Sequence, residues 1–283
     1  MASGNMKAIK RRIKSVGSTR QITKAMELVA SSKLRKAKSR AEQARPYFNE
    51  LYKSLCEIAS ANTDFSTIFT EKREVKNKLF IVIAGDRGMA GGYNSNVLKM
   101  AAAAHAEDAE LPKIIAIGRK SGEYFAKRGY DVVASYANIA EDIKPNTAQD
   151  IADIAIEMFA RGEVDEVYVF YTMFVSSMSQ QPESMRVLPM DTVQLENYGT
   201  MEYDPSPEAV FNRIVPRFTA SLIQCAVVES FASEQGARRN AMESATDNAD
   251  AMTESLSLLY NRARQASITN EIIDIVSGAS AQS

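Results

Sequence analysis

Four glycines follow an apolar run in the stretch LFIVIAGDRGMAGGYN, residues 79–94. Glycine loops between a strand and a helix hold phosphate in many enzymes, because backbone N–H groups at a helix start attract anions. The dinucleotide fingerprint needs G-x-G-x-x-G, and the NTPase loop needs G-x-x-x-x-G-K-[ST]. Here the glycines at 85, 88, 91 and 92 form no G-x-G, and the chain contains no Gly-Lys pair. We therefore predict a tight turn, with anion binding through Arg87 as the alternative.

Other catalytic patterns are missing from the sequence. There is no G-x-S-x-G and no H-E-x-x-H, and the single histidine, His105, lies in an alanine-rich stretch. The two cysteines, Cys56 and Cys225, lie too far apart in the sequence to form a metal or redox motif, and we interpret them as thiols in a reducing compartment. The sequence thus predicts no catalytic, metal-binding or cofactor-binding residue.

The middle of the chain, residues 75–200, alternates between apolar runs and helical patterns. We predict strands at 79–84, 114–117, 131–134 and 166–173, and helices at 95–106, 119–128 and 147–161. Such alternation, with strands that do not alternate in polarity, is typical of a mostly parallel sheet covered by helices. Segment 183–195 is predicted as an edge strand, since Pro189 cannot donate to a central ladder. We expect a Rossmann-like α/β head.

The N-terminal segment, residues 1–60, carries a heptad pattern. Steps of four and three residues from Ile9 to Ile58 meet mainly apolar side chains, a period typical of a helix packed along another helix. Arg20, Thr23 and Glu27 interrupt the stripe, which Ile22, Met26 and Val29 flank. Alanines in the middle predict a close approach of the partner helix, and Pro46 is expected to kink or end the regular run.

The C-terminal segment, residues 207–283, repeats the pattern. Ser206 and Pro207 predict a helix start. One apolar stripe contains Phe211, Phe218, Leu222, Cys225, Val228 and Ala232, and a second contains Ala249, Met252, Leu256, Leu259, Ala263, Ala266 and Ile273. Between them the stripe fades, with Gly236 inside. We predict that the two terminal segments form one long antiparallel two-helix coiled coil. The alternative is that each segment pairs with a second copy of the chain.

Charge is distributed unevenly along the chain. Residues 1–45 contain thirteen basic and two acidic residues, a net charge of +11, whereas residues 230–283 carry −3. A basic arm is typical of proteins that bind nucleic acid, an anionic membrane surface or an acidic protein. No uninterrupted apolar run approaches the roughly 20 residues that span a bilayer. We expect no transmembrane segment.

The two ends of the chain also resemble a known family. The run ITNEIIDIVSGASA, residues 268–281, is similar to the signature of the gamma subunit of F-type ATP synthases, of bacterial type. Further similar runs are RQITKAMELVASSKLRKAKSR, DRGMAGGYN, ASEQGARRNAMESATDNA and LYNRARQASIT. The resemblance covers essentially the whole chain.

The resemblance implies a mechanical function. A gamma subunit is the rotor shaft of the synthase, with its coiled coil inside a ring of three alpha and three beta subunits. Its head lies with the epsilon subunit on the membrane ring of c subunits. Catalysis belongs to the beta subunits, so the chain is expected to be non-catalytic, without cofactor and without nucleic acid as partner. The expected location is the cytoplasmic face of the bacterial plasma membrane, as a peripheral part of the complex.

The resemblance also assigns contact residues. Residues expected to meet the catalytic ring are Lys24, Met26, Arg238, Gln265, Thr269 and Glu271, and Tyr203 lies in the expected foot near epsilon and the c ring. The alternatives are coiled-coil packing for Met26 and a solvated helix face for Gln265 and Thr269. Chloroplast relatives carry an inserted cysteine pair, which has no counterpart here. We therefore predict no thiol switch.

Two other functions remain as alternatives. A nucleotide-binding α/β enzyme with a helical arm would bind nucleotide by itself. A nucleic-acid-binding coiled coil would bind DNA through the basic arm, with an affinity that falls as salt rises.

Overall fold

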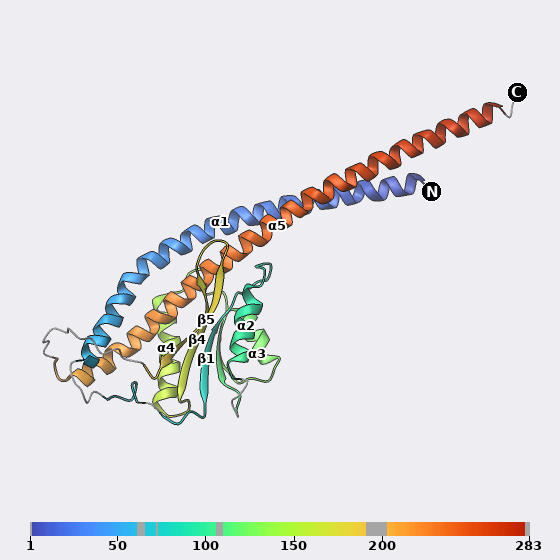
Figure 1. Ribbon diagram of the computed structural model, residues 1–283. Helices are drawn as coiled ribbons and strands as arrows, with labels where there is room; N and C mark the ends of the chain where they lie inside the picture. The colour runs from blue at the N-terminus through green and yellow to red at the C-terminus, as the bar shows by residue number, and fades with distance from the viewer. Residues whose placement is uncertain (1, 61–65, 72, 106–109, 191–202, 281–283) are drawn as a thin grey trace. The chain divides into compact units, whose positions relative to one another are not determined.

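A computed structural model describes residues 2–60, 66–71, 73–105, 110–190 and 203–280. Its contacts group the chain into two compact units (Figure 1). One unit contains Met1–Val29 and Arg239–Ser283, and the other contains Ala30–Arg238. The two long helices, α1 (Ala2–Ser60) and α5 (Pro207–Ser280), each contribute to both units. The division into segments 1–60, 75–200 and 207–283 stays a prediction about domains.

The larger unit is built on one five-stranded sheet. Its strands are β1 (Lys78–Ile83), β2 (Lys113–Ile117), β3 (Val132–Tyr136), β4 (Glu166–Phe174) and β5 (Gln180–Leu188), in the order β3-β2-β1-β4-β5. All pairings are parallel except β4 with β5. The predicted mostly parallel sheet is confirmed, and so is an edge strand after residue 179. Residues 191–195 of the predicted strand lie outside the described residues.

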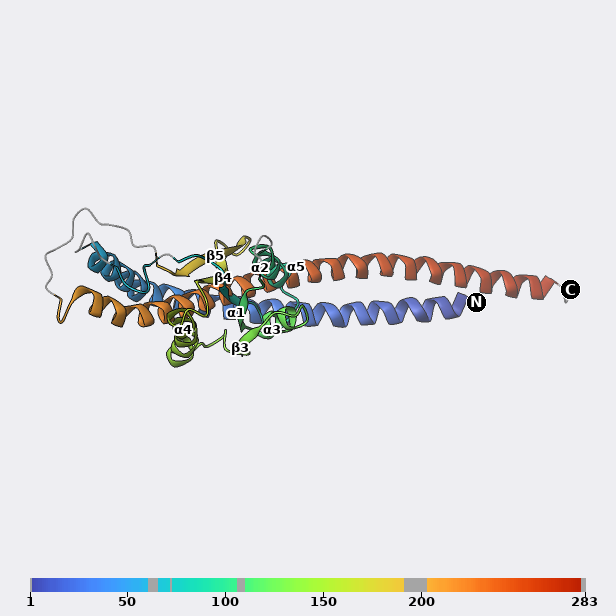
Figure 2. The same cartoon turned by 90° about the horizontal axis from the view of Figure 1, so that it is seen from below.

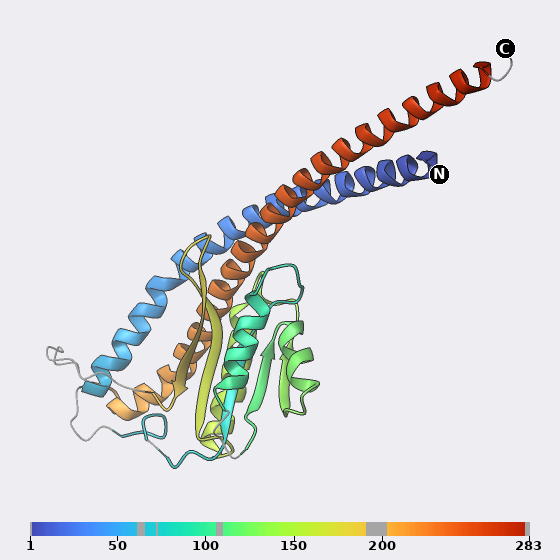
Figure 3. The same ribbon diagram turned by 45° about the vertical axis from the view of Figure 1, so that its right-hand side comes forward.

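Helices cover both faces of this sheet (Figures 2 and 3). On one face, helices α2 (Tyr93–Ala103) and α3 (Arg119–Ala126) pack against Phe80, Val82 and Phe170. On the other face, helix α4 (Pro145–Ala160) packs with parts of α1 and α5 against the alternate residues of the same strands. The three central strands β1, β2 and β4 are therefore mostly buried on both sides, which explains why their sequences show continuous apolar runs.

Parts of the long helices belong to this core. Leu34 and Leu55 of α1, and Phe211 and Ile223 of α5, are buried with the sheet and α4. The sequence predicted only a coiled coil for these segments, because a heptad stripe identifies a buried face without identifying what covers it. Helix α1 also continues through Pro46, so that proline does not end it.

The start of α5 follows the predicted chemistry. Ser206 Oγ accepts a hydrogen bond from the Ala209 backbone N–H at 3.2 Å, and Pro207 is the first helical residue. The proline has no N–H to leave unsatisfied in the first turn. This cap defines where the C-terminal helix begins.

The smaller unit pairs the beginning of α1 with the end of α5, running antiparallel (Figure 1). On α1 the seam follows the predicted steps, with Thr23 and Glu27 less than 10% exposed. On α5 buried and half-buried positions recur at steps of four and three, with Ala245 and Ser257 half-buried beside them: Met242, Thr246, Ala249, Thr253, Leu256, Tyr260, Ala263 and Ser267. The predicted intrachain antiparallel coiled coil is confirmed.

The side chains in this seam differ from the prediction. Polar residues belong to it: Thr23 and Thr246 share a hydrogen bond of 2.8 Å, and Arg20 pairs with Asp250 beside them. Apolar residues of the predicted stripe lie outside it, since Met252 is 55% exposed and Leu259 48%. The predicted C-terminal stripe was wrong at these positions because it selected residues by polarity, whereas the antiparallel register decides which positions face the partner.

One helix passes a length and composition test for a membrane span. Among the described residues it is the helix over Pro207–Ser277, whose most apolar window is 67% buried inside the chain. That burial is against the sheet and α4. The apolar character of α5 is thus the requirement of a core helix.

Candidate functional site

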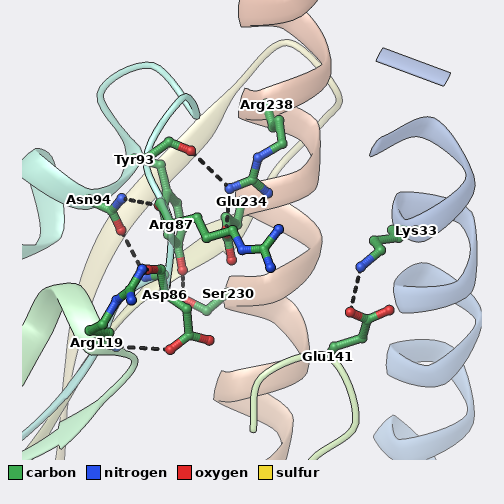
Figure 4. Close-up of polar contacts among 12 residues, drawn as sticks. Lys33, Asp86, Arg87, Tyr93, Asn94, Arg119, Glu141, Ser230, Glu234 and Arg238 are labelled. Atoms are coloured by element: carbon green, nitrogen blue, oxygen red, sulfur yellow. Dashed lines mark hydrogen bonds and ion pairs between the residues drawn. The ribbon is translucent and has the colours of Figure 1, made fainter. Parts of the chain in front are cut away.

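The glycine loop after β1 uses its polar groups within the chain (Figure 4). Gly85 N–H donates to Asn94 Oδ1 at 2.8 Å, and Asn94 Nδ2 donates to the Arg87 carbonyl at 3.0 Å. Asp86 Oδ1 accepts the backbone N–H groups of Arg119 and Asn138, both at 3.0 Å. A helix start attracts an anion, and here the carboxylate of Asp86 already lies at the start of α3.

Helix α5 closes the crevice above this loop. The strand order reverses at β1, and in open α/β sheets ligands bind at such a point, outside the carboxyl ends of the strands. Here Tyr93 OH donates to Ser230 Oγ of α5 at 3.2 Å, and the Thr172 N–H donates to the same oxygen at 3.0 Å. A Cβ on Gly85 would lie only 3.0 Å from the Glu234 carboxyl group. The glycine thus permits the helix to approach, which supports the predicted tight turn.

Close packing also accounts for a second glycine. Gly118, between β2 and α3, has φ +88, and a Cβ there would lie 2.0 Å from the Ala84 carbonyl oxygen. Only glycine adopts this φ without strain and leaves room for that carbonyl. This close approach packs the turn after β2 against the end of β1.

A buried ion pair fastens α5 to the loop. Arg238 Nη2 donates to Glu234 Oε1 at 2.6 Å and to the Gly88 carbonyl at 3.2 Å. The two side chains are only 12% and 7% exposed. Burial raises the pKa of Glu234 more than the charge of Arg238 lowers it. Burial, with a contribution from Glu234, also raises the pKa of Tyr93.

Arg238 is therefore placed differently from the other predicted contact residues. Its guanidinium is mostly buried and already paired, in the larger unit (Figure 4). The sequence predicted that it faces a partner subunit, and that contact stays a prediction. Any such partner meets an arginine that already holds Glu234 and the loop.

The predicted contact residues of the smaller unit lie at two separate places along its helices. Lys24 is exposed and its Nζ lies 3.0 Å from Glu27 Oε2, while Met26 is half-buried. Gln265 and Thr269 are exposed on α5. Thr23 pairs with Thr246, so Gln265 lies 19 residues, about 28 Å, further along the unit. The structure does not bring these residues into one cluster.

Two further predicted contacts have local partners. Glu271 is exposed and accepts a hydrogen bond from Ser267 Oγ at 3.4 Å. Tyr203, just before α5, is half-buried against the core of the larger unit, and burial raises its pKa. Both side chains keep a solvent-accessible part.

Comparison with known proteins now adds to this geometry. A family model described as ATP synthase matches residues 5–282. The ATP synthase gamma chain of Ruminococcus albus is 51% identical over 280 residues, covering 97% of this chain and 98% of the relative. The chain belongs to the ATP synthase gamma chain family. The sodium ion specific gamma chain of Acetobacterium woodii is 43% identical, with 98% of both chains covered.

Solved structures support the same assignment. A chain of the central stalk and c-ring of the Tetrahymena thermophila mitochondrial ATP synthase aligns with TM-score 0.63 and 25% identity, over 79% of this chain and 99% of that one. A chain of the Euglena gracilis mitochondrial ATP synthase aligns with TM-score 0.71 over 99% and 95%, at 17% identity. The second comparison shows the fold alone.

Against this family background, one group of side chains was missed. In the smaller unit Ser267 is the last described buried residue of the α5 seam, and beyond it Ile268, Ile272, Ile273, Ile275 and Val276 are all 49–72% exposed. The sequence prediction placed only Ile273 of this group in an apolar stripe, and it placed that residue in the coiled-coil seam. The sequence does contain a signal for this exposed group, namely four apolar residues within 272–276. Four apolar residues so close together cannot all lie on one face of a helix.

The cysteines and acidic residues form no chemical centre. Cys56 is buried, Cys225 is half-buried, and neither forms a disulfide bond within the described residues. Among the described residues no group of three or more His, Cys, Asp or Glu could hold a metal ion.

Proposed function

We propose that this member of the ATP synthase gamma chain family is the rotating central shaft that couples ion-driven rotation to the catalytic subunits. The observation that carries the proposal is the end of α5, where five large apolar side chains are exposed in the free chain. Leaving such side chains in water is unfavourable, and grouped apolar exposure marks an interaction site. A surrounding collar of other subunits would bury them.

In this proposal the partners are three alpha and three beta subunits around the coiled coil. The epsilon subunit and the c ring meet the foot, near Tyr203. The chain has no catalytic role in this proposal. The polar groups of its glycine loop form hydrogen bonds within the chain, to Asn94 and between Asp86 and Arg119, and are not directed at a substrate. The complex lies on the cytoplasmic face of the plasma membrane, to which this chain contributes no span.

Exposure suits the proposed contacts with the beta subunits. Lys24, Gln265, Thr269 and Glu271 are exposed, and pairs between exposed charges are worth about 0.2–1 kcal/mol each. Contacts of this size hold a subunit without preventing release at the next step of rotation. Met26 adds a half-buried apolar contact beside Lys24.

Arg238 has a different task in the same proposal. Its pair with Glu234 fixes the loop against α5, so that torque arriving along the helix reaches the head without slippage. Contact with a beta subunit would use the small exposed part of the guanidinium.

Reconstitution tests the proposal. The chain is mixed with alpha and beta subunits from the same source, any complex is isolated, and ATP hydrolysis is measured with and without the chain. We expect one copy per three alpha and three beta subunits, and activity only when the chain is present. A chain that ignores alpha and beta but binds nucleotide or DNA by itself would refute the proposal.

A variant sharpens this experiment. A chain ending at Ser267 keeps the whole described seam but lacks the exposed apolar end. We expect it to fold and to assemble less tightly than the full chain. Equal assembly would show that the apolar end is not the part that the other subunits bury.

A further inference from the structure

A basic groove lies between α2 and α3 on the head, away from the glycine loop's buried ion pair. It is a hollow of about 400 Å³, and Lys99, Lys120, Lys127 and Arg128 contribute four positive charges to its lining. Glu123 is the one acidic residue that lines it. The net charge of the lining is therefore +3, although the whole chain carries −1.

The floor and walls of the groove are ordered by the fold. Leu98 is 5% exposed and belongs to the core between the sheet and the two helices. The guanidinium of Arg128 lies 3.6 Å from the centre of the Tyr124 ring, which fixes both side chains at one end. An apolar floor with charged walls is what an amphipathic ligand needs.

The one carboxylate of the groove does not balance its four cations. Lys120 Nζ lies 2.7 Å from Glu123 Oε2, and Arg128 stacks on Tyr124. Lys127 also contributes to lowering the pKa of Glu123, so three cations share one carboxylate. Lys99 is exposed and has no ion pair in the part of the chain that the structure describes. The groove therefore keeps an excess of positive charge for a ligand.

The spacing of the cations indicates the shape of the ligand. Lys120 and Lys127 are seven residues apart along α3, which is about 10 Å. A ligand with two anionic groups about 10 Å apart matches this backbone spacing. Carboxylates at i and i+7 of an α-helix are also about 10 Å apart and on one face, whereas same-face positions on a strand repeat near 6.6 and 13 Å.

We propose that this groove docks an acidic α-helix of a partner protein, with its carboxylates on Lys99, Lys120 and Lys127 and an apolar side chain over Leu98. The site lies outside the contacts assigned above to the catalytic ring and the foot, and nothing in the proposed rotor function requires it.

Peptide binding to the full-length chain tests this proposal. The probe is a fluorescein-labelled helical peptide of about 20 residues with Glu at i, i+4 and i+7 and Leu between them on the same face. We expect saturable binding by fluorescence anisotropy, weakening as salt rises. The double variant K99E/K127E should bind at least about tenfold more weakly, since two attractions become repulsions.

A matched control reverses two other cations of the head. Lys144 and Arg161 are 69% and 63% exposed and lie outside the groove. K144E/R161E should change peptide affinity by less than about twofold, because it changes total charge equally but leaves the groove intact. Equal weakening by both double variants would overturn the proposal, since binding would then reflect net charge alone.

Two competitors distinguish other ligands. Pyrophosphate and a single-stranded DNA of similar charge are titrated against the chain under the same conditions. Binding of either one that depends on Lys99 and Lys127, with no saturable peptide binding, would overturn the acidic-helix assignment. A photocrosslinking residue at Ser95 should label the bound peptide, whereas one at Arg161 should not.

Discussion

Glu234 is a buried carboxyl group, largely shielded from solvent. Its side chain is 7% exposed, with Arg238 as its ion-pair partner and the backbone of the glycine loop beside it. Losing hydration favours the neutral acid, and the neighbouring positive charge favours the carboxylate. Here burial is the larger effect, so the pKa of Glu234 lies above its ordinary value of 4.5.

This direction gives a pH-dependent prediction. Because the folded-state pKa is raised, the folded chain holds the Glu234 proton more tightly than the unfolded chain. The stabilisation is complete below about 4.5 and is lost as pH rises through the folded-state pKa. We expect the stability of the natural chain, relative to Glu234→Gln, to increase as pH falls from 7 to 5.

Urea unfolding followed by circular dichroism at both pH values measures this difference. Glu243→Gln, at an exposed position of the same helix, shows what removing a carboxylate does without burial. An identical stability difference for Glu234→Gln at pH 7 and pH 5 would contradict the assignment.

At the scale of the element, the coiled coil is held by small and polar side chains. Ala249 is 5% exposed, and Thr23 bonds to Thr246 across the seam. Small side chains let the helices approach, and a polar pair in a seam favours one register over its neighbours. A seam of this kind fixes the register of the two helices, but it buries less apolar surface than a seam of large side chains and is stabilised less by it.

Enlarging a seam residue tests the register. Ala249→Leu should destabilise the chain by about 1–3 kcal/mol, because extra methylenes have no room between the helices. Ala266→Leu makes the same change at an exposed position of α5 and should be nearly neutral. Urea unfolding of both variants measures the two effects. Equal destabilisation by both variants would support the stripe that the sequence alone predicted, which contains both alanines.

At the scale of the whole molecule, the free chain leaves many large apolar side chains exposed to solvent. Apolar side chains remain exposed in both helices of the smaller unit, including Ile22, Leu28 and Val29 of α1 at 56–62%. They lie outside the seam, so the other helix does not cover them. These surfaces fit a subunit that is stable alone but is designed to be surrounded.

Removing the apolar end should separate folding from assembly. Ile272 and Ile275 are 55% and 72% exposed, so the double variant I272S/I275S should change the free energy of unfolding by less than about 1 kcal/mol. Binding to alpha and beta subunits should weaken, because the apolar area available for burial falls. Asn270→Ser, at an exposed polar position just before them, is the control and should assemble normally.

Stability by thermal unfolding and assembly by size-exclusion chromatography give the two measurements. Loss of stability in the isolated double variant would show that these isoleucines pack within the free chain after all.

The sequence by itself determined the local features of this protein. Strand runs, helix periods, the Ser206 cap and the turn glycines depend on neighbours within a few residues, so 79–84 and 166–173 were predicted within two residues of β1 and β4. The family resemblance was equally readable, because its motifs are contiguous.

Tertiary structure alone decided which faces of the helices and strands contact one another. Glu234 and Gly85 are 149 positions apart, Thr23 and Thr246 are 223, and no period along either helix states that they touch. Burial of a charge and register between helices are properties of pairs of surfaces, which exist only once the chain has folded.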